Sequence, residues 1–351
     1  MPHRPQLGWI PERTWIFVVG TLEWKHDDLW APFPKENRRD AALVELFRGL
    51  GVPSSQIAYL QDRQASTRRI QQTLEEHLAG SGPDDLLVLY YCGHGDRADD
   101  GTAYFASYDA DGDANQGWVV DTIPATVERC FAGSRALLIA DCCCSGSLAD
   151  ATSRHARRVA YACLASSLAN ETSTGNWTFT EGLLAGLRGQ AFVDGDGDSA
   201  ITLRELAAQI ADSMVFAEEQ LTTFATAGGF NPEMVIAAAR PRPDPRVGGR
   251  VEVNSGGEWY PAQIVDARGD QLKVHYYGYE ESDDEWVAEK NVREPQPMVY
   301  KPGAAVEVHW RGEWYTARVL AVQGGAHHIQ YNDYGPEWNE WVPSKRIRPS
   351  E

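Results

Sequence analysis

Short apolar runs alternate with amphipathic segments over the first 240 residues, and this alternation limits the possible folds more than any other feature. The runs have the length and composition of buried strands and cover Trp15–Gly20, Ile57–Leu60, Leu86–Tyr91 and Ala136–Ala140. Apolar spacing of three and four predicts helices over Arg39–Leu50 and Thr67–Leu78. We therefore expect an α/β fold, a mainly parallel sheet flanked by helices. Later in this region we predict a fifth strand at Val159–Ala165, helices at Phe179–Leu187 and Leu203–Phe216, and a last strand at Glu233–Ala238.

The chain changes character after residue 240. Three prolines within Arg240–Arg246 can continue neither a helix nor a central strand, which predicts a linker over 241–247. The sequence beyond it repeats with a constant offset of 55 residues, as Glu258-Trp-Tyr260 and Glu313-Trp-Tyr315 illustrate. Alternating apolar residues in each repeat predict a small SH3-like β-barrel. We expect one domain over 1–240 and two barrels over 248–297 and 298–351.

The charge balance and the cysteines exclude several classes of function. The 351 residues include 32 Lys plus Arg and 50 Asp plus Glu, and the net charge of −18 repels phosphate backbones, so no nucleic-acid partner is expected. No apolar stretch reaches the roughly 18 residues of a spanning helix, and Met1–Pro11 lacks a signal pattern, so we expect no membrane span and a cytoplasmic location. Six cysteines, three of them consecutive, suit neither a disulfide framework nor a zinc site.

Two short motifs follow predicted strands at the edge where an open parallel sheet binds its ligands. Leu86–Tyr91 runs into Cys92-Gly-His94-Gly95, and Ala136–Ala140 runs into Asp141 and three cysteines. A thiol attacks carbonyl carbon as thiolate, so it needs a nearby base, and it benefits from backbone N–H groups that hold the oxyanion. His94 and one cysteine of the triplet supply the pair. A packed inert thiol cluster, or a metal site that adds His94 or Cys92, is the alternative.

The motifs Tyr91-Cys-Gly-His-Gly95 and Asp141-x-Cys143-x-Ser145-Gly resemble the histidine and cysteine motifs of the caspase-like peptidases, in particular the metacaspases and their bacterial relatives. The resemblance covers most of residues 10–240. It implies that His94 transfers protons, that Cys143 is the nucleophile, and that the N–H groups of Gly95 and Cys143 form the oxyanion hole. It also implies an acyl-enzyme intermediate that water hydrolyses, with no cofactor required.

Acidic residues near the motifs are candidates for substrate binding. Metacaspases have acids before a Gln-Thr-Ser stretch, where this chain has Asn170 and Glu171, and Asp28 after the first strand is a further candidate. Asp141 at the strand end is expected to position the loop at the substrate site. Because the chain is acidic, we predict cleavage after a P1 Arg or Lys. The alternative for each of these acids is a solvated loop charge.

An acidic segment before a predicted helix matches the twelve-residue EF-hand calcium loop. The predicted ligands are Asp194, Asp196, Asp198, Thr202 and Glu205. Ser199 departs from the pattern at the position where glycine is usual. Calcium is therefore the expected metal, and some metacaspases, which this chain resembles, need it. The alternative is an acidic cap on the N-terminus of the following helix.

The C-terminal repeats resemble chromo-barrel and Tudor-type modules in the pattern around Tyr276 and its copy. Those families surround methylated ammonium groups with aromatic rings, which attract cations. The resemblance makes candidate cages of Tyr276, Tyr279 and Trp286 in the first repeat and Tyr331, Tyr334 and Trp341 in the second. We favour core packing for most of these rings, because a barrel of about 50 residues needs large side chains to fill it. In either case we expect the repeats to bind a partner protein or peptide.

The sequence as a whole is interpreted as a caspase-like cysteine endopeptidase that acts on protein substrates, with barrels that recruit or regulate those substrates. The resemblance to bacterial relatives implies a role in defence or cell death, and a gasdermin-like pore former as substrate. The alternative is a catalytically silent caspase-like scaffold whose barrels bind a partner protein. A calcium-sensing regulator is a third hypothesis.

Overall fold

The computed structural model describes residues 5–36, 38–171, 173–242, 244–295, 300–310, 312–323 and 326–350. Internal contacts divide the chain into two units, Met1–Ala207 with Thr222–Arg240, and Ala208–Leu221 with Pro241–Glu351. The second unit therefore includes a segment that lies before the predicted linker. The two units are described separately.

A six-stranded sheet forms the centre of the first unit, with the strand order β10-β8-β7-β3-β1-β2. The strands are β1 Thr14–Gly20, β2 Ile57–Gln61, β3 Leu86–Cys92, β7 Arg135–Asp141, β8 Ala160–Ala165 and β10 Thr223–Ala227. All neighbours are parallel except β10, which pairs antiparallel with β8 at one edge. The predicted mainly parallel sheet is confirmed. Its inner strands are apolar on both faces because both faces are covered.

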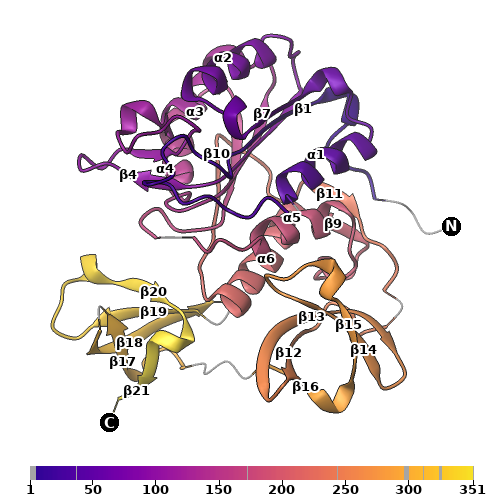
Figure 1. The fold of residues 1–351 in the computed structure, drawn as a ribbon, viewed down its shortest axis with the longest axis vertical. Helices are drawn as coiled ribbons and strands as arrows, with labels where there is room; N and C mark the ends of the chain where they lie inside the picture. The colour runs from indigo at the N-terminus through magenta and orange to yellow at the C-terminus, as the bar shows by residue number, and fades with distance from the viewer. Residues whose placement is uncertain are drawn as a thin grey trace. The chain divides into compact units, whose positions relative to one another are not determined.

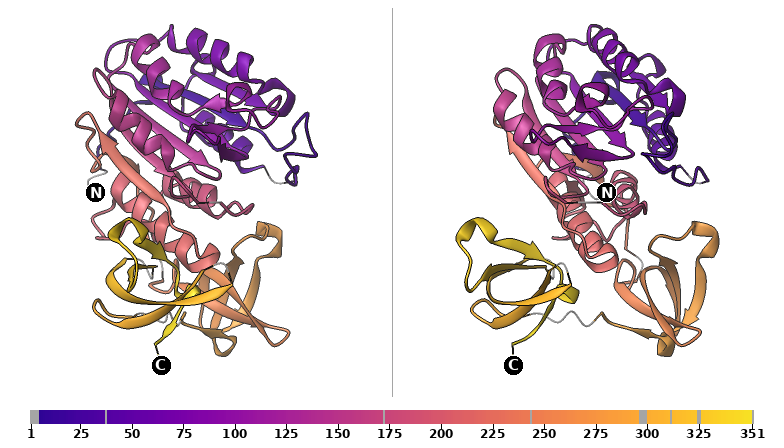
Figure 2. Two further views of the ribbon diagram at one scale, coloured as in Figure 1. Left: turned by 90° about the vertical axis from the view of Figure 1, so that its left-hand side faces the viewer. Right: turned by 60° about the vertical axis from the view of Figure 1, so that its left-hand side comes forward.

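Helices cover the two faces of the sheet, as Figures 1 and 2 show. The helices are α1 Arg39–Gly49, α2 Thr67–Leu78, α3 Thr122–Cys130, α4 Ser147–His155 and α5 Thr178–Leu187. A further helix, α6 Leu203–Glu218, begins in the first unit and continues into the second. The helices α2, α3 and α4 share a core with alternate strand residues such as Phe17, Leu89 and Leu138. The opposite face meets α1 and α5, where the Tyr90 hydroxyl lies 2.6 Å from the Thr180 hydroxyl.

Two smaller sheets complete the first unit. The short strands β4 Gly95–Arg97, β5 Ala103–Phe105 and β6 Trp118–Val119 form an antiparallel sheet after the histidine motif. The strand predicted at Glu233–Ala238 forms as β11 Val235–Ala238, but it pairs with β9 Ala200–Thr202 outside the main sheet. The sixth strand of the main sheet is instead β10, which the sequence pattern did not indicate because its residues are only half-buried.

Each C-terminal repeat is a five-stranded antiparallel barrel-like sheet, orange for the first and yellow for the second in Figure 1. The first comprises β12 Arg250–Ser255, β13 Glu258–Arg268, β14 Gln271–Tyr276, β15 Glu285–Ala288 and β16 Val292–Arg293. The second comprises β17 Ala305–Trp310, β18 Glu313–Gln323, β19 Ala326–Tyr331, β20 Glu340–Val342 and β21 Ile347–Pro349. Corresponding residues fill the two cores, as Val253 and Val308 show, so the predicted repeat is also a structural repeat.

Candidate active site

His94 lies two residues beyond β3, in the loop that leads to β4. The rings of Trp24, Trp30 and Phe33 enclose its imidazole, with centroid separations of 4.5, 5.6 and 4.5 Å. Its Nε2 atom lies 2.8 Å from the carbonyl oxygen of Ala31. A carbonyl only accepts hydrogen bonds, so Nε2 carries the proton of the neutral ring and Nδ1 is the atom that can take up another. Burial lowers the pKa of His94, and the Ala31 contact opposes this only in part.

Cys143 lies two residues beyond the end of β7. Its Sγ atom accepts a hydrogen bond from the backbone N–H of Ser173, with an N···S distance of 3.1 Å. Burial raises the pKa of the Cys143 thiol, and the Ser173 N–H offsets part of this rise. The thiol is therefore protonated at neutral pH, and it needs a base before it can attack a carbonyl carbon.

The histidine and cysteine loops are in direct contact. Their strands are neighbours in the sheet, with Cys92 paired to Asp141 at the carboxyl ends. The N–H of Gly93 donates to the carbonyl oxygen of Asp141 at 3.4 Å. A Cβ atom at Gly95 would lie 2.2 Å from the carbonyl oxygen of Cys143, so this position requires glycine. The two residues predicted to form the oxyanion hole are thus adjacent.

Two serines fix the cysteine loop: Ser145, which belongs to the cysteine motif, and Ser167, which sequence reasoning missed. Ser167 accepts from the N–H of Ser145 at 3.1 Å, and its own N–H donates back to the Ser145 hydroxyl at 3.1 Å. The Ser167 hydroxyl also donates to the carbonyl oxygen of Cys142 at 3.0 Å. Ser167 follows β8, so the rule that located the two motifs, parallel strands ending at one edge, could have found it as well.

The other two cysteines of the triplet differ from Cys143. Cys142 is 2% exposed, and burial raises the pKa of its thiol far above the usual value. Cys144 is half-buried with a φ of +55°, and its N–H donates to the carbonyl oxygen of Glu171 at 2.8 Å. Burial raises the pKa of the Cys144 thiol too. Among the interactions of the described residues, Cys143 is the only cysteine of the three whose thiol accepts a hydrogen bond from the backbone of the loop after β8.

The predicted substrate-binding residues are not gathered in one place by the described contacts. Asp141 is buried at the end of β7, and its Oδ2 atom accepts a hydrogen bond from the Thr180 hydroxyl at 2.6 Å. Glu171 lies against the cysteine loop through its backbone carbonyl, whereas Asn170 is exposed in a turn beside it. Asp28 is an exposed residue of the segment that also carries the aromatic rings around the histidine.

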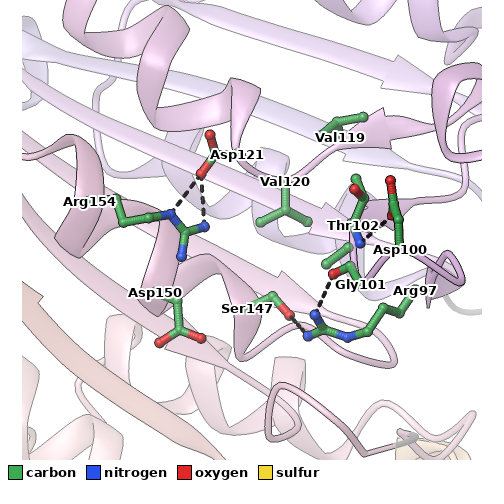
Figure 3. Close-up of a pocket in the computed structure, with 11 residues that line it drawn as sticks. Arg97, Asp100, Gly101, Thr102, Val119, Val120, Asp121, Ser147, Asp150 and Arg154 are labelled. Atoms are coloured by element: carbon green, nitrogen blue, oxygen red, sulfur yellow. Dashed lines mark hydrogen bonds and ion pairs between the residues drawn. The ribbon is translucent and has the colours of Figure 1, made fainter.

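A cavity of about 460 Å³ lies beside the N-terminus of α4, and neither His94 nor Cys143 lines it. Figure 3 shows Arg97 reaching across it to Ser147. The guanidinium donates to the Ser147 hydroxyl at 2.8 Å and to the carbonyl oxygen of Ala169 at 2.9 Å. Ser147 is the first residue of α4 and directly follows the cysteine loop. Arg97, in β4, therefore connects the end of the cysteine loop to the loop after β8.

Three of the five predicted calcium ligands, all aspartates, lie together in the loop before β9. One carboxylate oxygen each from Asp194, Asp196 and Asp198 lie within 4.8 Å of one another. Ser199, which departs from the sequence pattern, has a φ of +74° and so adopts the left-handed conformation that glycine usually supplies.

Glu205 closes this loop from the first turn of α6. One carboxylate oxygen accepts the N–H of Gly195 at 2.9 Å, and the other accepts the N–H and hydroxyl of Thr202 at 2.9 and 2.8 Å. Burial alone would raise the pKa of Glu205, but these donors hold it below the usual value. The loop therefore keeps an ionised carboxylate at its twelfth position, as a calcium site requires.

Three tyrosines form a cluster in the first repeat. The Tyr276 ring lies 6.3 Å from Tyr260 and 6.1 Å from Tyr279, each in an edge-to-face arrangement. Tyr276 is buried in the core, whereas Tyr279 is 50% exposed. Trp286 lies under the guanidinium of Arg268 at 4.7 Å, and no ring contact among the described residues joins it to the tyrosines.

The second repeat has a larger cluster. Tyr331 and Tyr334 lie 5.8 Å apart, and Tyr315 lies 6.1 and 6.2 Å from them. Trp338 packs on Tyr334 at 5.9 Å, and Trp310 bridges Trp338 and Tyr315 at 6.3 and 6.0 Å. Five rings thus face one another, and three of them are between 38% and 51% exposed.

The predicted cage of the second repeat differs from this cluster in its tryptophan. Trp341 stacks on His328 at 5.1 Å instead of meeting the tyrosines. Sequence reasoning missed Trp310 and Trp338 because it relied on residues that both repeats share, and these two have no aromatic counterpart at the 55-residue offset.

No helix within the described residues is long and apolar enough to cross a membrane.

Family models match both the segment that contains the two motifs and the two C-terminal repeats. The model of the metacaspase peptidase C14 domain matches residues 52–152, a range that contains both His94 and Cys143. The Agenet domain model matches twice, at residues 248–298 and 303–351. No curated protein matches the sequence.

Three solved structures are similar to parts of the chain. Protein GSU0716 from Geobacter sulfurreducens is 17% identical with a TM-score of 0.47, over 65% of this chain and 100% of that one. The AGD34 structure of Arabidopsis thaliana AGDP1 is 21% identical with a TM-score of 0.15, over 30% of this chain and 81% of that one. The tandem Agenet domain 3-4 of ADCP1 is 21% identical with a TM-score of 0.14, over 30% of this chain and 79% of that one.

Proposed function

We propose that this chain, which joins a metacaspase-type peptidase C14 domain to two Agenet domains, is a cysteine endopeptidase that uses Cys143 as nucleophile and His94 as base. The observation that carries the proposal is the contact between the two strand-end loops, where Gly95 packs against the backbone of Cys143. Two reactive side chains at adjacent parallel strand ends, with a glycine between them, are what acyl transfer by a thiol requires.

The reaction begins from a neutral thiol and a neutral imidazole. The Nδ1 atom of His94 takes the thiol proton as the Cys143 sulfur attacks the scissile carbonyl carbon. The N–H groups of Gly95 and Cys143 stabilise the oxyanion. The C–N bond breaks as His94 returns the proton to the leaving amine, and a thioester remains. His94 then removes a proton from water, which hydrolyses the thioester and regenerates the thiol.

A basic P1 residue is the proposed specificity. The support is Asp141, a carboxylate at the start of the cysteine loop that accepts the Thr180 hydroxyl from α5. Asp28 and Glu171 are the proposed contributors of further negative charge. A gasdermin-like pore former is the proposed substrate, and bacterial defence or cell death the proposed role, by resemblance to the bacterial relatives of the metacaspases.

Calcium is the proposed regulator. Three aspartates with converging oxygens, an ionised Glu205 and a left-handed residue at position 199 fit an oxygen-ligated site. The loop leads directly into α6, so a bound ion would order the start of that helix.

The repeats are the proposed partner-binding part of the chain. The five-ring cluster of the second repeat supports binding of a methylated ammonium group, because exposed aromatic faces attract a cation that is weakly hydrated. A partner protein held there would bring the substrate to the peptidase or keep it away.

The decisive experiment compares wild-type protein with Cys143→Ala on fluorogenic peptides that carry Arg, Lys or Asp at P1, each with calcium and with a chelator. We expect cleavage after Arg or Lys that Cys143→Ala abolishes. Cys144→Ala is the matched control, because it removes a neighbouring thiol, and it should retain activity.

The alternative of a silent scaffold makes the opposite predictions. No cleavage under any condition, combined with a Cys143 thiol that a small electrophile fails to label, would favour the scaffold. Cleavage that survives Cys143→Ala and disappears in Cys144→Ala would move the nucleophile to the neighbouring residue.

A further inference from the structure

The two repeats differ around an otherwise shared tyrosine cluster. Tyr260, Tyr276 and Tyr279 of the first repeat correspond to the three tyrosines of the second at the 55-residue offset. Both clusters have edge-to-face rings at similar separations, 6.3 and 6.1 Å in the first and 6.1 and 5.8 Å in the second. The backbone and the central rings are therefore the same, and any difference in ligand must come from the residues around them.

The first difference is the loss of two rings. Trp310 and Trp338, which enlarge the cluster of the second repeat, correspond to Ser255 and Asp283 in the first. Both replacements are exposed. The first repeat therefore presents three rings and a carboxylate where the second presents five rings.

The second difference is an uncompensated carboxylate. In the second repeat Glu340 accepts the Tyr331 hydroxyl at 2.7 Å and is neutralised by Arg346 at 2.7 and 3.1 Å. In the first repeat Glu285 accepts the Tyr276 hydroxyl at 2.8 Å, but Asn291 stands where the arginine would be. Glu285 is exposed and forms no ion pair with any described residue.

The two repeats also differ in net charge. Residues 248–297 contain eleven acids and five bases, a net charge of −6, whereas residues 298–351 contain six of each. Glu258 accepts the Tyr260 hydroxyl at 2.8 Å, as Glu313 accepts the Tyr315 hydroxyl at 2.9 Å in the second repeat. This carboxylate is therefore shared, and the difference lies in Asp283 and Glu285. The net charge therefore attracts a basic partner to the first repeat, whereas a cation at the second repeat depends on the aromatic rings alone.

We infer that the tyrosine cluster of the first repeat, with Glu258, Asp283 and Glu285 beside it, binds a Lys or Arg side chain that keeps its N–H donors. Aromatic rings attract any cation, but carboxylates add charge-assisted hydrogen bonds only to a cation that still has hydrogens on nitrogen. A trimethylated ammonium has no such donors and suits the five-ring cluster of the second repeat. The tandem would thus read two different basic residues of one protein partner. The inference rests on the partner-binding role proposed above and is independent of peptidase activity.

The test uses the full chain carrying Cys143→Ala, titrated calorimetrically with three Gly/Ser-rich peptides that differ only in one residue, Lys, trimethyllysine or Arg. The key variant is Asn291→Arg, which supplies the first repeat with the arginine of the second at an exposed position. We expect it to weaken binding of the Lys and Arg peptides by about tenfold or more and to leave the trimethyllysine peptide unaffected. Trp338→Ala should weaken binding of the trimethyllysine peptide and leave binding of the Lys and Arg peptides unaffected. Glu285→Gln should repeat the effect of Asn291→Arg without adding charge, and melting temperatures confirm that each variant is folded.

Each outcome decides the inference. Lys and Arg binding that survives Asn291→Arg and Glu285→Gln, or that is lost in Trp338→Ala, would overturn it. Trimethyllysine binding that survives Trp338→Ala and is lost in Asn291→Arg would overturn it as well. If only trimethyllysine binds, at the second repeat, this inference fails while the proposed partner role stands. If no peptide binds, both fail.

Discussion

The Nε2 atom of His94 and the carbonyl oxygen of Ala31 are 2.8 Å apart, and this contact decides which nitrogen of the imidazole reacts. With the proton held on Nε2, only Nδ1 can serve as base. Trp24 and Phe33, each 4.5 Å from the ring, exclude water and favour its neutral form.

The pH dependence of activity follows from this environment. We expect the acid limb of the kcat/KM profile to lie below pH about 6.5, the usual pKa of histidine. His94 must be neutral to accept the thiol proton, and its lowered pKa keeps it neutral to lower pH, so activity is lost only as the pH falls through that lowered value. Phe33→Ala, which admits water to the imidazole, should move the acid limb to higher pH. A wild-type limb above pH about 6.5 would contradict the buried neutral histidine.

Gly95→Ala tests the contact between the two loops. The new methyl group would lie 2.2 Å from the Cys143 carbonyl oxygen, so the loops must separate. We expect kcat to fall by about 10²-fold or more, the effect of losing one oxyanion donor. Gly49→Ala is the control, because its Cβ would meet nothing within 4 Å, and it should leave kcat unchanged. Equal activity of the two variants would mean that Gly95 has no part in the site.

Arg97→Lys tests the connection across the cavity beside α4. The Nη2 atom of Arg97 donates to both Ser147 and Ala169, while its Nη1 atom donates to the carbonyl oxygen of Gly101 at 2.6 Å. The single nitrogen of a lysine cannot make all these contacts, so we expect a loss of about 2–3 kcal/mol in the free energy of unfolding, together with lower kcat. Chemical denaturation and peptide cleavage measure the two effects. Arg154→Lys, at a more exposed ion pair with Asp121, should cost under about 1 kcal/mol. Similar losses in both variants would remove the special role of Arg97.

Calcium should raise the melting temperature of the protein. Binding to the folded state alone adds about 2.7 kcal/mol at a hundred times the dissociation constant, and each kcal/mol shifts the midpoint by about 2–4 °C in a unit of this size. Asp194→Ala should abolish the shift, whereas Asp111→Ala, in another acidic segment, should retain it. A melting temperature that calcium leaves unchanged in wild type would favour the acidic helix cap.

The sequence predicted the buried parallel strands and the helices α1, α2, α5 and α6, and it missed the helices α3 and α4 and several short or exposed strands. The parallel strands were identifiable because their residues are buried on both faces, and the two motifs were found because they follow such strands. The family resemblance that they indicated is confirmed by the metacaspase and Agenet matches. The edge strand β10 and the short strands β4 to β6 are too short or too exposed to leave an apolar pattern.

The sequence predicted the two reactive residues of the site but missed several residues that hold them in position. Arg97 acts through a hydrogen bond to the backbone of a distant segment, and such a bond leaves no local pattern in the sequence. Ser167 follows β8, so its place at the end of a parallel strand was the one available signal. Trp24 and Phe33 approach His94 from a long irregular segment whose path depends on the tertiary fold. Trp310 and Trp338 were missed for a different reason, since a search for what two repeats share overlooks what distinguishes them.

Helix α6 belongs to more than one part of the chain. It begins at the acidic loop, and its later residues contact the first repeat, where Arg250 donates to Gln209 at 2.8 Å and the ring of Tyr277 packs on Phe216 at 5.9 Å. The proline-rich linker suggests a truncation at Arg240. A chain that ended there would keep Phe216 but lose Tyr277, the ring that packs on it. The peptidase domain and the first repeat are therefore not interchangeable modules, and a functional graft of either onto another protein must carry the matching surface of this helix with it.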